Sequence, residues 1–244
     1  MNYKLTIAYD GTRYRGWQRL GDSGQTIQGK IEAVLSRMEG RTVEISGSGR
    51  TDAGAHAMGQ VATVQLSGDR GPKEIKDYVN FYLPEDIGIL SVEEAPPRFH
   101  ARLSSSWKTY RYRIWMSSQP CIFERKYCYC PERIPDAEIM REAAQQFLGT
   151  HDFRAFHTGK TKKSTVRTIY SIELLQVGPE LQIFFTGDGF LYNMVRIMVG
   201  TLLEIGWGDR PAKDIARLLT QQERAQAGFT APPQGLCLME VVYL

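Results

Sequence analysis

The sequence predicts an α+β fold of two units, each with a mostly antiparallel sheet, and three observations predict it. Segments in which apolar residues alternate, as in half-buried strands, occur in both halves of the chain. Segments with apolar residues three and four positions apart, as in amphipathic helices, also occur in both halves. The two kinds follow one another in mixed order. With 244 residues the chain can bury two modest cores, which we assign to residues 1–104 and 105–244.

The first half begins with a predicted strand at 3–9, in which every second residue is large and apolar or aromatic. Thr26 precedes a helical pattern and is a plausible N-cap, because its hydroxyl can accept a bond from the first amides of a helix. Pro72 stands where a second helix begins, since proline suits the first turn. In order, the predicted elements are a strand at 3–9, a helix at 27–38, strands at 43–45 and 61–66, a helix at 72–82 and a strand at 87–92.

The second half contains a turn signal at 177–180, with Gly178 and Pro179, which separates two predicted strands. The strongly apolar run at 190–205 predicts a buried helix. In order, the predicted elements are a strand at 108–115, a helix at 136–147, strands at 167–177 and 181–186, helices at 190–205 and 212–219, and a strand at 238–243.

The composition argues against several classes of protein. The chain is 42% hydrophobic and 23% charged, as in ordinary globular proteins. No run approaches the ~18 apolar residues of a membrane-spanning helix, and the N-terminus lacks the apolar core of a signal peptide. We therefore expect a cytoplasmic protein with no membrane partner. The four cysteines lack the paired spacing of zinc ligands and are expected to be reduced thiols.

A net charge of +3 does not by itself indicate a nucleic-acid-binding protein. Basic residues nevertheless cluster locally, and the clusters at 13–17 and 108–113 include aromatic residues. Cations contact phosphates and aromatic rings stack on unpaired bases, so these clusters suit single-stranded RNA. Taken alone, a solvated basic surface with ordinary core aromatics explains them at least as well.

The stretch with the most chemistry is the glycine-rich segment at 47–57. It places one carboxylate, that of Asp52, between Arg50 and His56. A second acid at a fixed spacing, a nucleophile-elbow serine and a phosphate-binding glycine–lysine signature are all absent from its sequence. Asp52 and His56 are too few to hold a metal ion. Physical reasoning alone leaves two interpretations open, a catalytic carboxylate or an aspartate that caps the turn.

A set of motifs, in order and spread over nearly the whole chain, resembles the tRNA pseudouridine synthase A family. The Asp52 segment resembles the family signature, with Ala55 where valine is more common. The other motifs are Tyr9-Asp10-Gly11-Thr12-x-Tyr14-x-Gly16-Trp17-Gln18, Thr26-Ile27-Gln28-Gly29, Leu83-Pro84-x-Asp86-Ile87, Phe99-His100-Ala101-Arg102, Lys108-x-Tyr110-x-Tyr112, Gly189-Phe190-Leu191-x-x-Met194-Val195-Arg196 and Ala231-Pro232-Pro233-x-Gly235-Leu236.

The resemblance implies the pseudouridine synthase fold, with an active-site cleft between the two units, and it implies that Asp52 is the catalytic aspartate. The family reaction breaks the bond between ribose C1′ and uracil N1, rotates the base and rejoins it through C5. An ionised carboxylate could attack covalently or stabilise positive charge at C1′. Because the reaction needs no redox step and no external group, neither a cofactor nor a metal is expected.

Three further residues take their expected roles from the resemblance. Arg196 would pair with Asp52, because an ionised carboxylate in a dry pocket needs a nearby cation; an arginine reaching solvent is the alternative. Tyr110 would pack against the target uracil and could help remove the C5 proton, although Tyr112 shares its strand face and both could be core aromatics. Arg50 would hold the flipped-out nucleotide, or contact a phosphate.

The resemblance also implies a homodimer, with each tRNA lying across both subunits and uridines 38, 39 and 40 of the anticodon stem-loop as targets. The same isomerisation at another tRNA or structured-RNA site is an alternative, and a non-catalytic RNA-binding module is a less favoured one. The lysine-rich segment at 160–163 is expected to be an RNA-contacting loop or a solvated surface loop. His56 and His100 are expected to bond turn or core groups as neutral rings.

Overall fold

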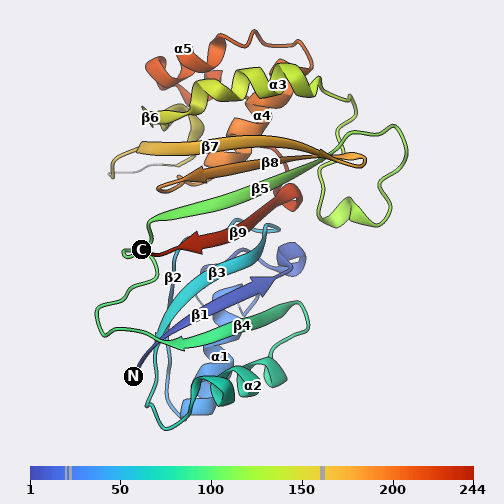
Figure 1. The fold of residues 1–244 in the computed structure, drawn as a ribbon. Helices are drawn as coiled ribbons and strands as arrows, with labels where there is room; N and C mark the ends of the chain where they lie inside the picture. The colour runs from blue at the N-terminus through green and yellow to red at the C-terminus, as the bar shows by residue number, and fades with distance from the viewer. Residues whose placement is uncertain (20, 22–23, 160–162) are drawn as a thin grey trace. The chain divides into compact units, whose positions relative to one another are not determined.

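Helices and strands follow one another in mixed order in this protein, whose computed structural model describes residues 1–19, 21, 24–159 and 163–244 (Figure 1). Contacts divide the chain into two units, Met1–Ser106 with Cys237–Leu244, and Trp107–Leu236. Nearly all of the last strand therefore lies with the first unit, although the sequence analysis assigned it to the second. Each unit combines helices with a mostly antiparallel sheet, which confirms the predicted α+β class. Three residues of the predicted RNA-contacting loop, 160–162, lie outside the described residues.

The sheet of the first unit has the strand order β4–β1–β3–β9, with the short β2 paired to β3. The alternation predicted for the first strand is confirmed, because Tyr3, Leu5 and Ile7 all point into the core. β9 pairs with β3 in parallel at His56 and Ala57, whereas the other pairs are antiparallel. The strands are β1 (Asn2–Tyr9), β2 (Ile45–Gly47), β3 (His56–Gln65), β4 (Ile87–Glu94) and β9 (Leu236–Val242).

Two helices, α1 (Ile27–Glu39) and α2 (Pro72–Tyr82), complete the first unit. The side chain of Thr26 accepts a bond from the Gly29 amide at 3.3 Å, so it is the N-cap that the sequence predicts. The helices pack together, and the guanidinium of Arg37 lies 4.3 Å from the ring centre of Tyr82. α2 also packs against β4.

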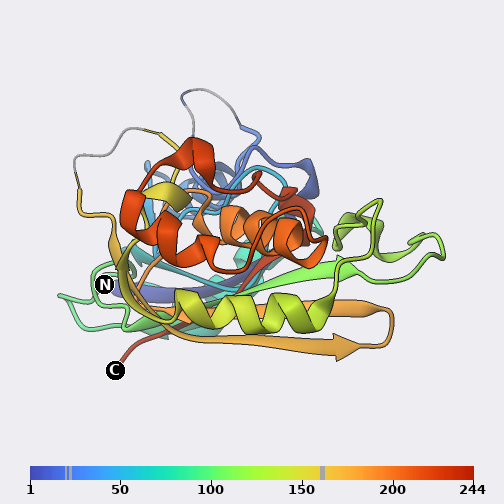
Figure 2. The same ribbon diagram turned by 90° about the horizontal axis from the view of Figure 1, so that it is seen from above.

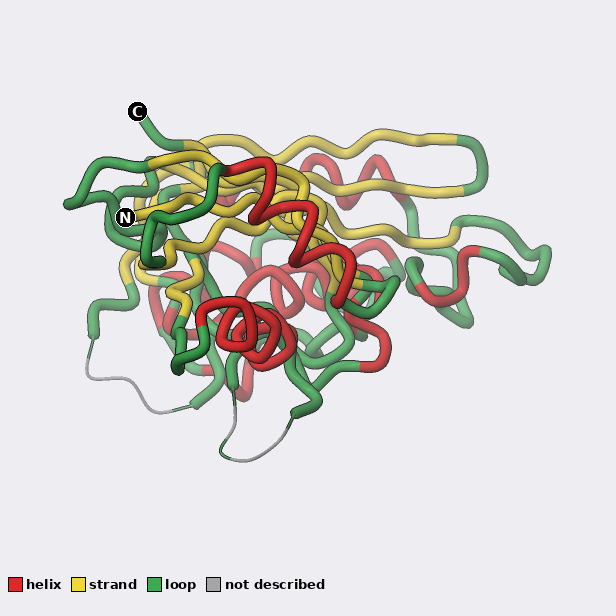
Figure 3. The backbone as a smooth tube through the Cα atoms, turned by 90° about the horizontal axis from the view of Figure 1, so that it is seen from below, coloured by secondary structure: helices red, strands yellow, loops and turns green. Residues whose placement is uncertain are grey.

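The sheet of the second unit has the strand order β5–β8–β7–β6, and all its pairs are antiparallel. β7 and β8 form the predicted hairpin, with Gly178 at φ 56° in the turn (Figure 3). The helix α3 (Ala137–Ala144) runs alongside β7 in both views of the ribbon (Figures 1 and 2). The strands are β5 (Trp107–Trp115), β6 (Gly149–Asp152), β7 (Val166–Val177) and β8 (Glu180–Gly187).

The helices of the second unit are α3 (Ala137–Ala144), α4 (Met194–Gly206) and α5 (Asp214–Gln221). α4 is the central helix, with 11 of its 13 residues buried, as its apolar run predicts. It begins at Met194 rather than at Phe190, because Asn193 has a left-handed backbone, φ 62°, that cannot continue an α-helix. Short 3-10 helices lie at Gly11–Arg13, Glu124–Lys126, Gln145–Phe147, Arg154–Phe156, Arg224–Gln226 and Pro233–Gly235.

A segment at 227–232, which we call the strap, lies directly against α4. The backbone approaches so closely that a Cβ at Gly200 would lie 1.9 Å from the Phe229 carbonyl oxygen. The amide of Gly228 donates to the Thr201 hydroxyl at 3.0 Å, and the amide of Ala231 donates to the Arg196 carbonyl at 3.1 Å. The strap is therefore fixed along one side of the helix.

Among the described residues, no helix combines the length and the apolar character needed to cross a bilayer.

We predict that Gly200→Ala destabilises the protein, although alanine is intrinsically the better helix former by about 1 kcal/mol. The added methyl would overlap the Phe229 carbonyl, and overpacking of this kind costs about 1–3 kcal/mol. Urea unfolding would measure the loss. Gly88→Ala in β4 is the control, because nothing lies within 4 Å of its Cβ position, and it should change the free energy of unfolding by less than about 0.5 kcal/mol. Equal effects at both sites would contradict the prediction.

Candidate active site

Asp52 lies in the loop that joins β2 to β3, on the first unit. The loop turns sharply after it, where the amide of Ala55 donates to the Asp52 carbonyl at 3.1 Å and Gly54 has φ 80°. Asp52 is half-buried, whereas Arg50, two residues earlier, is exposed. The loop thus carries a carboxylate and, two residues earlier, a cation that is exposed to solvent.

The loop at 10–17, which opens the family-like first motif, supports the Asp52 loop from one side. A Cβ at Gly11 would lie 1.8 Å from the Ala55 carbonyl oxygen, so only glycine permits this approach. The amide of Trp17 donates to the Thr51 carbonyl at 3.1 Å, and the amide of Gly54 donates to the Tyr14 carbonyl at 3.3 Å. Backbone contacts therefore fix the chain on both sides of Asp52.

A buried polar network supports the same loop from within. Gln60 of β3 is fully buried; its side chain accepts a bond from the Ser48 hydroxyl at 2.9 Å and donates to the Gly49 carbonyl at 3.0 Å. The hydroxyls of Tyr9 and Thr51 are 2.7 Å apart. Burial raises the pKa of Tyr9, so its hydroxyl keeps its proton for such a bond. The network therefore holds the loop in place where it leaves the sheet.

Asp86 holds the supporting loop at 10–17. Its carboxylate accepts bonds from the Tyr14 hydroxyl and from Nη2 of Arg13, both at 2.6 Å. Its carbonyl accepts the amide of Asp10 at 2.9 Å. Burial, together with the bond to Asp86, raises the pKa of Tyr14 to about 12. The motif around Asp86 therefore serves the architecture of the loop.

Both histidines singled out by the sequence bond backbone amides. The Gly11 amide donates to Nδ1 of His56 at 3.1 Å, and the Arg102 amide donates to Nδ1 of His100 at 3.1 Å. An amide can only donate, so each bond requires an unprotonated Nδ1. Nδ1 of His56 also lies 3.2 Å from a carboxylate oxygen of Asp10, with which it would pair only if protonated. The amide bonds match the turn-supporting role expected for neutral rings.

Arg196 lies on the first turn of α4 in the second unit. Its Nε donates to the Ala231 carbonyl at 2.7 Å and its Nη1 donates to Oδ1 of Asn193 at 2.9 Å. The residue is half-buried, in a helix that is otherwise almost wholly apolar. The strap and the residue before the helix therefore set the plane of the guanidinium.

The two tyrosines on one face of β5 differ in their surroundings. Tyr112 is fully buried, and its hydroxyl donates to the Pro232 carbonyl at 2.7 Å. Burial raises its pKa, although the nearby charge of Arg196 acts in the opposite direction. Tyr110 instead packs edge-to-face on Phe190, with ring centres 5.1 Å apart. Tyr112 thus has a structural bond to the strap, which the alternation of the strand could not predict.

The predicted site residues fall into two groups. Arg50 and Asp52 share a loop of the first unit, and Tyr110 and Arg196 lie in the second. The pairing of Asp52 with Arg196 joins the two units and stays a prediction. The sequence analysis missed Gln60 and Asn193, although each left a signal: a polar residue just before an apolar strand, and an asparagine within the run predicted as a buried helix.

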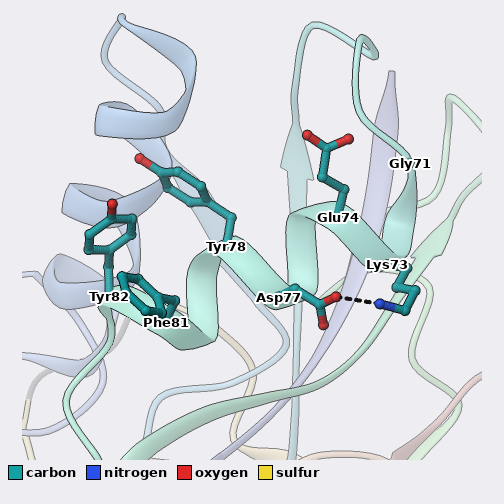
Figure 4. A pocket seen from close by; sticks show the side chains of 7 residues that line it. All are labelled: Gly71, Lys73, Glu74, Asp77, Tyr78, Phe81 and Tyr82. Carbon is teal, nitrogen blue, oxygen red and sulfur yellow. Dashed lines mark hydrogen bonds and ion pairs between the residues drawn. The ribbon is translucent and has the colours of Figure 1, made fainter.

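Within the described part of the chain, no group of three or more His, Cys, Asp or Glu side chains is placed to hold a metal ion. All four cysteines are free thiols. An open hollow lies on α2, where the rings of Tyr78 and Tyr82 are 4.8 Å apart (Figure 4). Among the residues that the structure describes, those lining this hollow include none of the predicted site residues.

We predict that Gln60→Leu destabilises the protein by about 1–3 kcal/mol, because the Ser48 hydroxyl and the Gly49 carbonyl both lose a buried partner. Thermal and urea unfolding would measure the change. Gln65→Leu is the matched control, since Gln65 is exposed on the same strand and its substitution should be nearly neutral. A neutral Gln60→Leu would show that the network does not hold the loop.

The sequence comparisons agree with the motifs. A family model described as tRNA pseudouridine synthase matches residues 5–103 and 143–244. The chain is 52% identical over 238 residues to a tRNA pseudouridine synthase A of Bacillus sp. (strain KSM-64), covering 97% of each chain. It is 47% identical over 243 residues to a tRNA pseudouridine synthase A 2 of Bacillus anthracis, covering 99% of each.

Among solved structures, the chain aligns with one titled "Crystal Structure of a Cbf5-Nop10-Gar1 Complex" at a TM-score of 0.41 and 11% identity, covering 97% of this chain and 48% of the other. A match at that level adds nothing to the assignment, which rests on the family match and the curated relatives. The resemblance drawn from the motifs is confirmed: this chain belongs to the tRNA pseudouridine synthase family.

Proposed function

We propose that the protein isomerises uridine to pseudouridine in tRNA, at positions 38, 39 and 40 of the anticodon stem-loop. The observation that carries the proposal is the lone carboxylate of Asp52, held on a rigid loop in a chain of this family. Relatives named tRNA pseudouridine synthase A share nearly the whole length of the chain, which supports tRNA as the substrate.

The isomerisation requires few catalytic groups. The N1–C1′ bond breaks, a C5–C1′ bond forms, C5 loses a proton and N1 gains one, so the product is an isomer of the substrate. Asp52 is the group proposed to act at C1′, as a nucleophile or as a fixed negative charge. A fixed charge is effective when its position does not change during the reaction, and the backbone contacts of the loop supply that condition.

Arg196 is proposed to stabilise the ionised form of Asp52. An arginine in a helix as apolar as α4 is unfavourable unless its guanidinium is bonded. Two of its nitrogens are bonded within its own unit, to Ala231 and Asn193. These bonds give the guanidinium a fixed plane, which suits recognition of a carboxylate.

Tyr110 and Arg50 are proposed to hold the nucleotide. A tyrosine offers a ring face for stacking on uracil and a hydroxyl near its edge. The ring of Tyr110 is held by Phe190, which belongs to the same motif as Arg196. Arg50 is exposed beside Asp52, so its guanidinium is available to a phosphate or to the strand from which the base is flipped out.

We further propose that the protein works as a cytoplasmic homodimer, with one tRNA contacting both subunits. Sedimentation of the purified protein should give twice the mass of one chain. A monomer that modifies tRNA at full rate would contradict the dimer but leave the isomerisation standing.

We predict that the wild-type protein releases tritium from tRNA labelled at C5 of uridine, and that Asp52→Asn lowers the rate by about a thousandfold or more, because the amide carries no charge. Glu44→Gln, at an exposed acid before the same loop, is the control and should release tritium normally. Release should survive dialysis against a chelator. Equal rates for Asp52→Asn and the wild type would remove Asp52 from the chemistry.

The substrate is tested separately with tRNAs in which uridines 38, 39 and 40 are replaced in turn. Release should fall in proportion to the sites removed. Undiminished release from a tRNA lacking all three would favour another tRNA or structured-RNA site, and tight binding without release from any RNA would favour the non-catalytic binding module.

A further inference from the structure

Asn193 has an unusual backbone for its place in the fold. Within the part of the chain that the structure describes, it is one of two non-glycine residues with positive φ, the other being Gln222. Gln222 ends α5, where a left-handed residue is common. Asn193 instead precedes the first residue of α4, where an extended backbone is the rule, yet it has φ 62° and ψ 4°. This conformation needs a reason other than helix initiation.

The side chain of Asn193 is committed to two partners outside the usual capping role. Its Oδ1 accepts a bond from Nη1 of Arg196 at 2.9 Å, and its Nδ2 donates to the Thr158 hydroxyl at 2.7 Å. Among the described hydrogen bonds, none joins this side chain to an amide of the first turn of α4. Asparagine is a favoured N-cap, so a stabilising bond is forgone here in exchange for the contact with Arg196.

Two hydrogen bonds, one to Ala231 and one to Asn193, hold the Arg196 guanidinium at different nitrogens. Ala231 accepts from Nε at 2.7 Å and Asn193 accepts from Nη1 at 2.9 Å, so the planar guanidinium is held at two points. Ala231 is itself fixed, because its amide donates to the Arg196 carbonyl at 3.1 Å. With the Asn193 amide removed, the guanidinium would lose one of these two bonds, and with it one constraint on its direction.

Asn193 also ties Arg196 to the segment before the lysine-rich stretch at 160–163. Thr158, which accepts from its Nδ2, is joined a second time where its amide donates to the Tyr192 carbonyl at 3.4 Å. The side chain of Asn193 therefore links Thr158 to the guanidinium of Arg196.

We propose that Asn193 is a positioning residue for the reaction: its left-handed backbone turns the side-chain amide onto Arg196 and fixes the direction of that guanidinium, with Thr158 holding the amide from the other side. The proposal rests on the function proposed for Arg196. It assigns a role to a residue that touches no reacting atom and acts through its neighbour.

The test begins with Asn193→Gly, because glycine adopts the left-handed backbone freely and removes only the amide. We expect kcat for tritium release to fall by about 10- to 100-fold, as for other residues that orient a functional side chain. KM for tRNA should change by less than about threefold, since a misdirected guanidinium affects the chemical step more than binding. Gln222→Gly, at the other left-handed residue, is the matched control and should leave kcat unchanged.

Two further variants separate positioning from general damage. Asn193→Asp keeps an oxygen that can accept from Arg196, so it should recover at least about tenfold of the kcat lost in Asn193→Gly. In an Arg196→Lys background, Asn193→Gly should cost less than about threefold, because the planar group to be oriented is gone. If Asn193→Gly lowered kcat by the same factor in the Arg196→Lys background as in the wild type, the proposal would be overturned.

The outcomes distinguish this proposal from the one on which it rests. Full activity in Arg196→Met would remove Arg196 from the reaction, and the role of Asn193 with it. An inactive Arg196→Met together with a fully active Asn193→Gly would overturn the positioning role alone. Loss of kcat with an equal rise in KM and a lower melting temperature in both Asn193 variants would show a structural role only.

Discussion

The position of Asp52 depends on a contact between two stretches of backbone. At Gly11 the chain lies so close to the Ala55 carbonyl that a Cβ would stand 1.8 Å from the oxygen, and so any side chain there would push the two loops apart. The amides of Trp17 and Gly54 then bond across the same interface. These contacts fix the backbone that carries the Asp52 carboxylate, and a charge whose position is fixed stabilises a developing opposite charge without first having to reorganise.

The second unit fixes Arg196 by the same means. Glycine at 200 lets the strap lie against α4, and the strap then presents the Ala231 carbonyl to Nε of Arg196. The next carbonyl, that of Pro232, takes the hydroxyl of Tyr112. In both units a glycine-dependent backbone contact lies behind a charged side chain.

The sequence predicted what depends on local pattern and missed what depends on distant partners. Alternation in the first strand and the apolar run of α4 define their elements because burial of a face repeats every two or every 3.6 residues. The sequence analysis placed the start of α4 too early. Asn193 has a left-handed backbone and its side chain bonds Arg196 and Thr158, and the spacing of apolar residues does not reveal these bonds. Gln60 was likewise missed because its partners, Ser48 and Gly49, lie 12 and 11 positions earlier, in the segment that follows the neighbouring strand β2.

Several residues of the family-like motifs make contacts within the protein that hold its loops in place. Asp86 holds Tyr14, Tyr112 holds the strap, and His56 accepts a backbone amide. The isomerisation of uridine adds no atoms to the substrate and needs one well-placed charge. Such a reaction therefore depends on how firmly that charge is held, more than on a large number of catalytic groups. These contacts are all internal to the protein. We therefore expect recognition of RNA to depend on exposed side chains outside this network; Arg50 is an exposed cation two positions before Asp52.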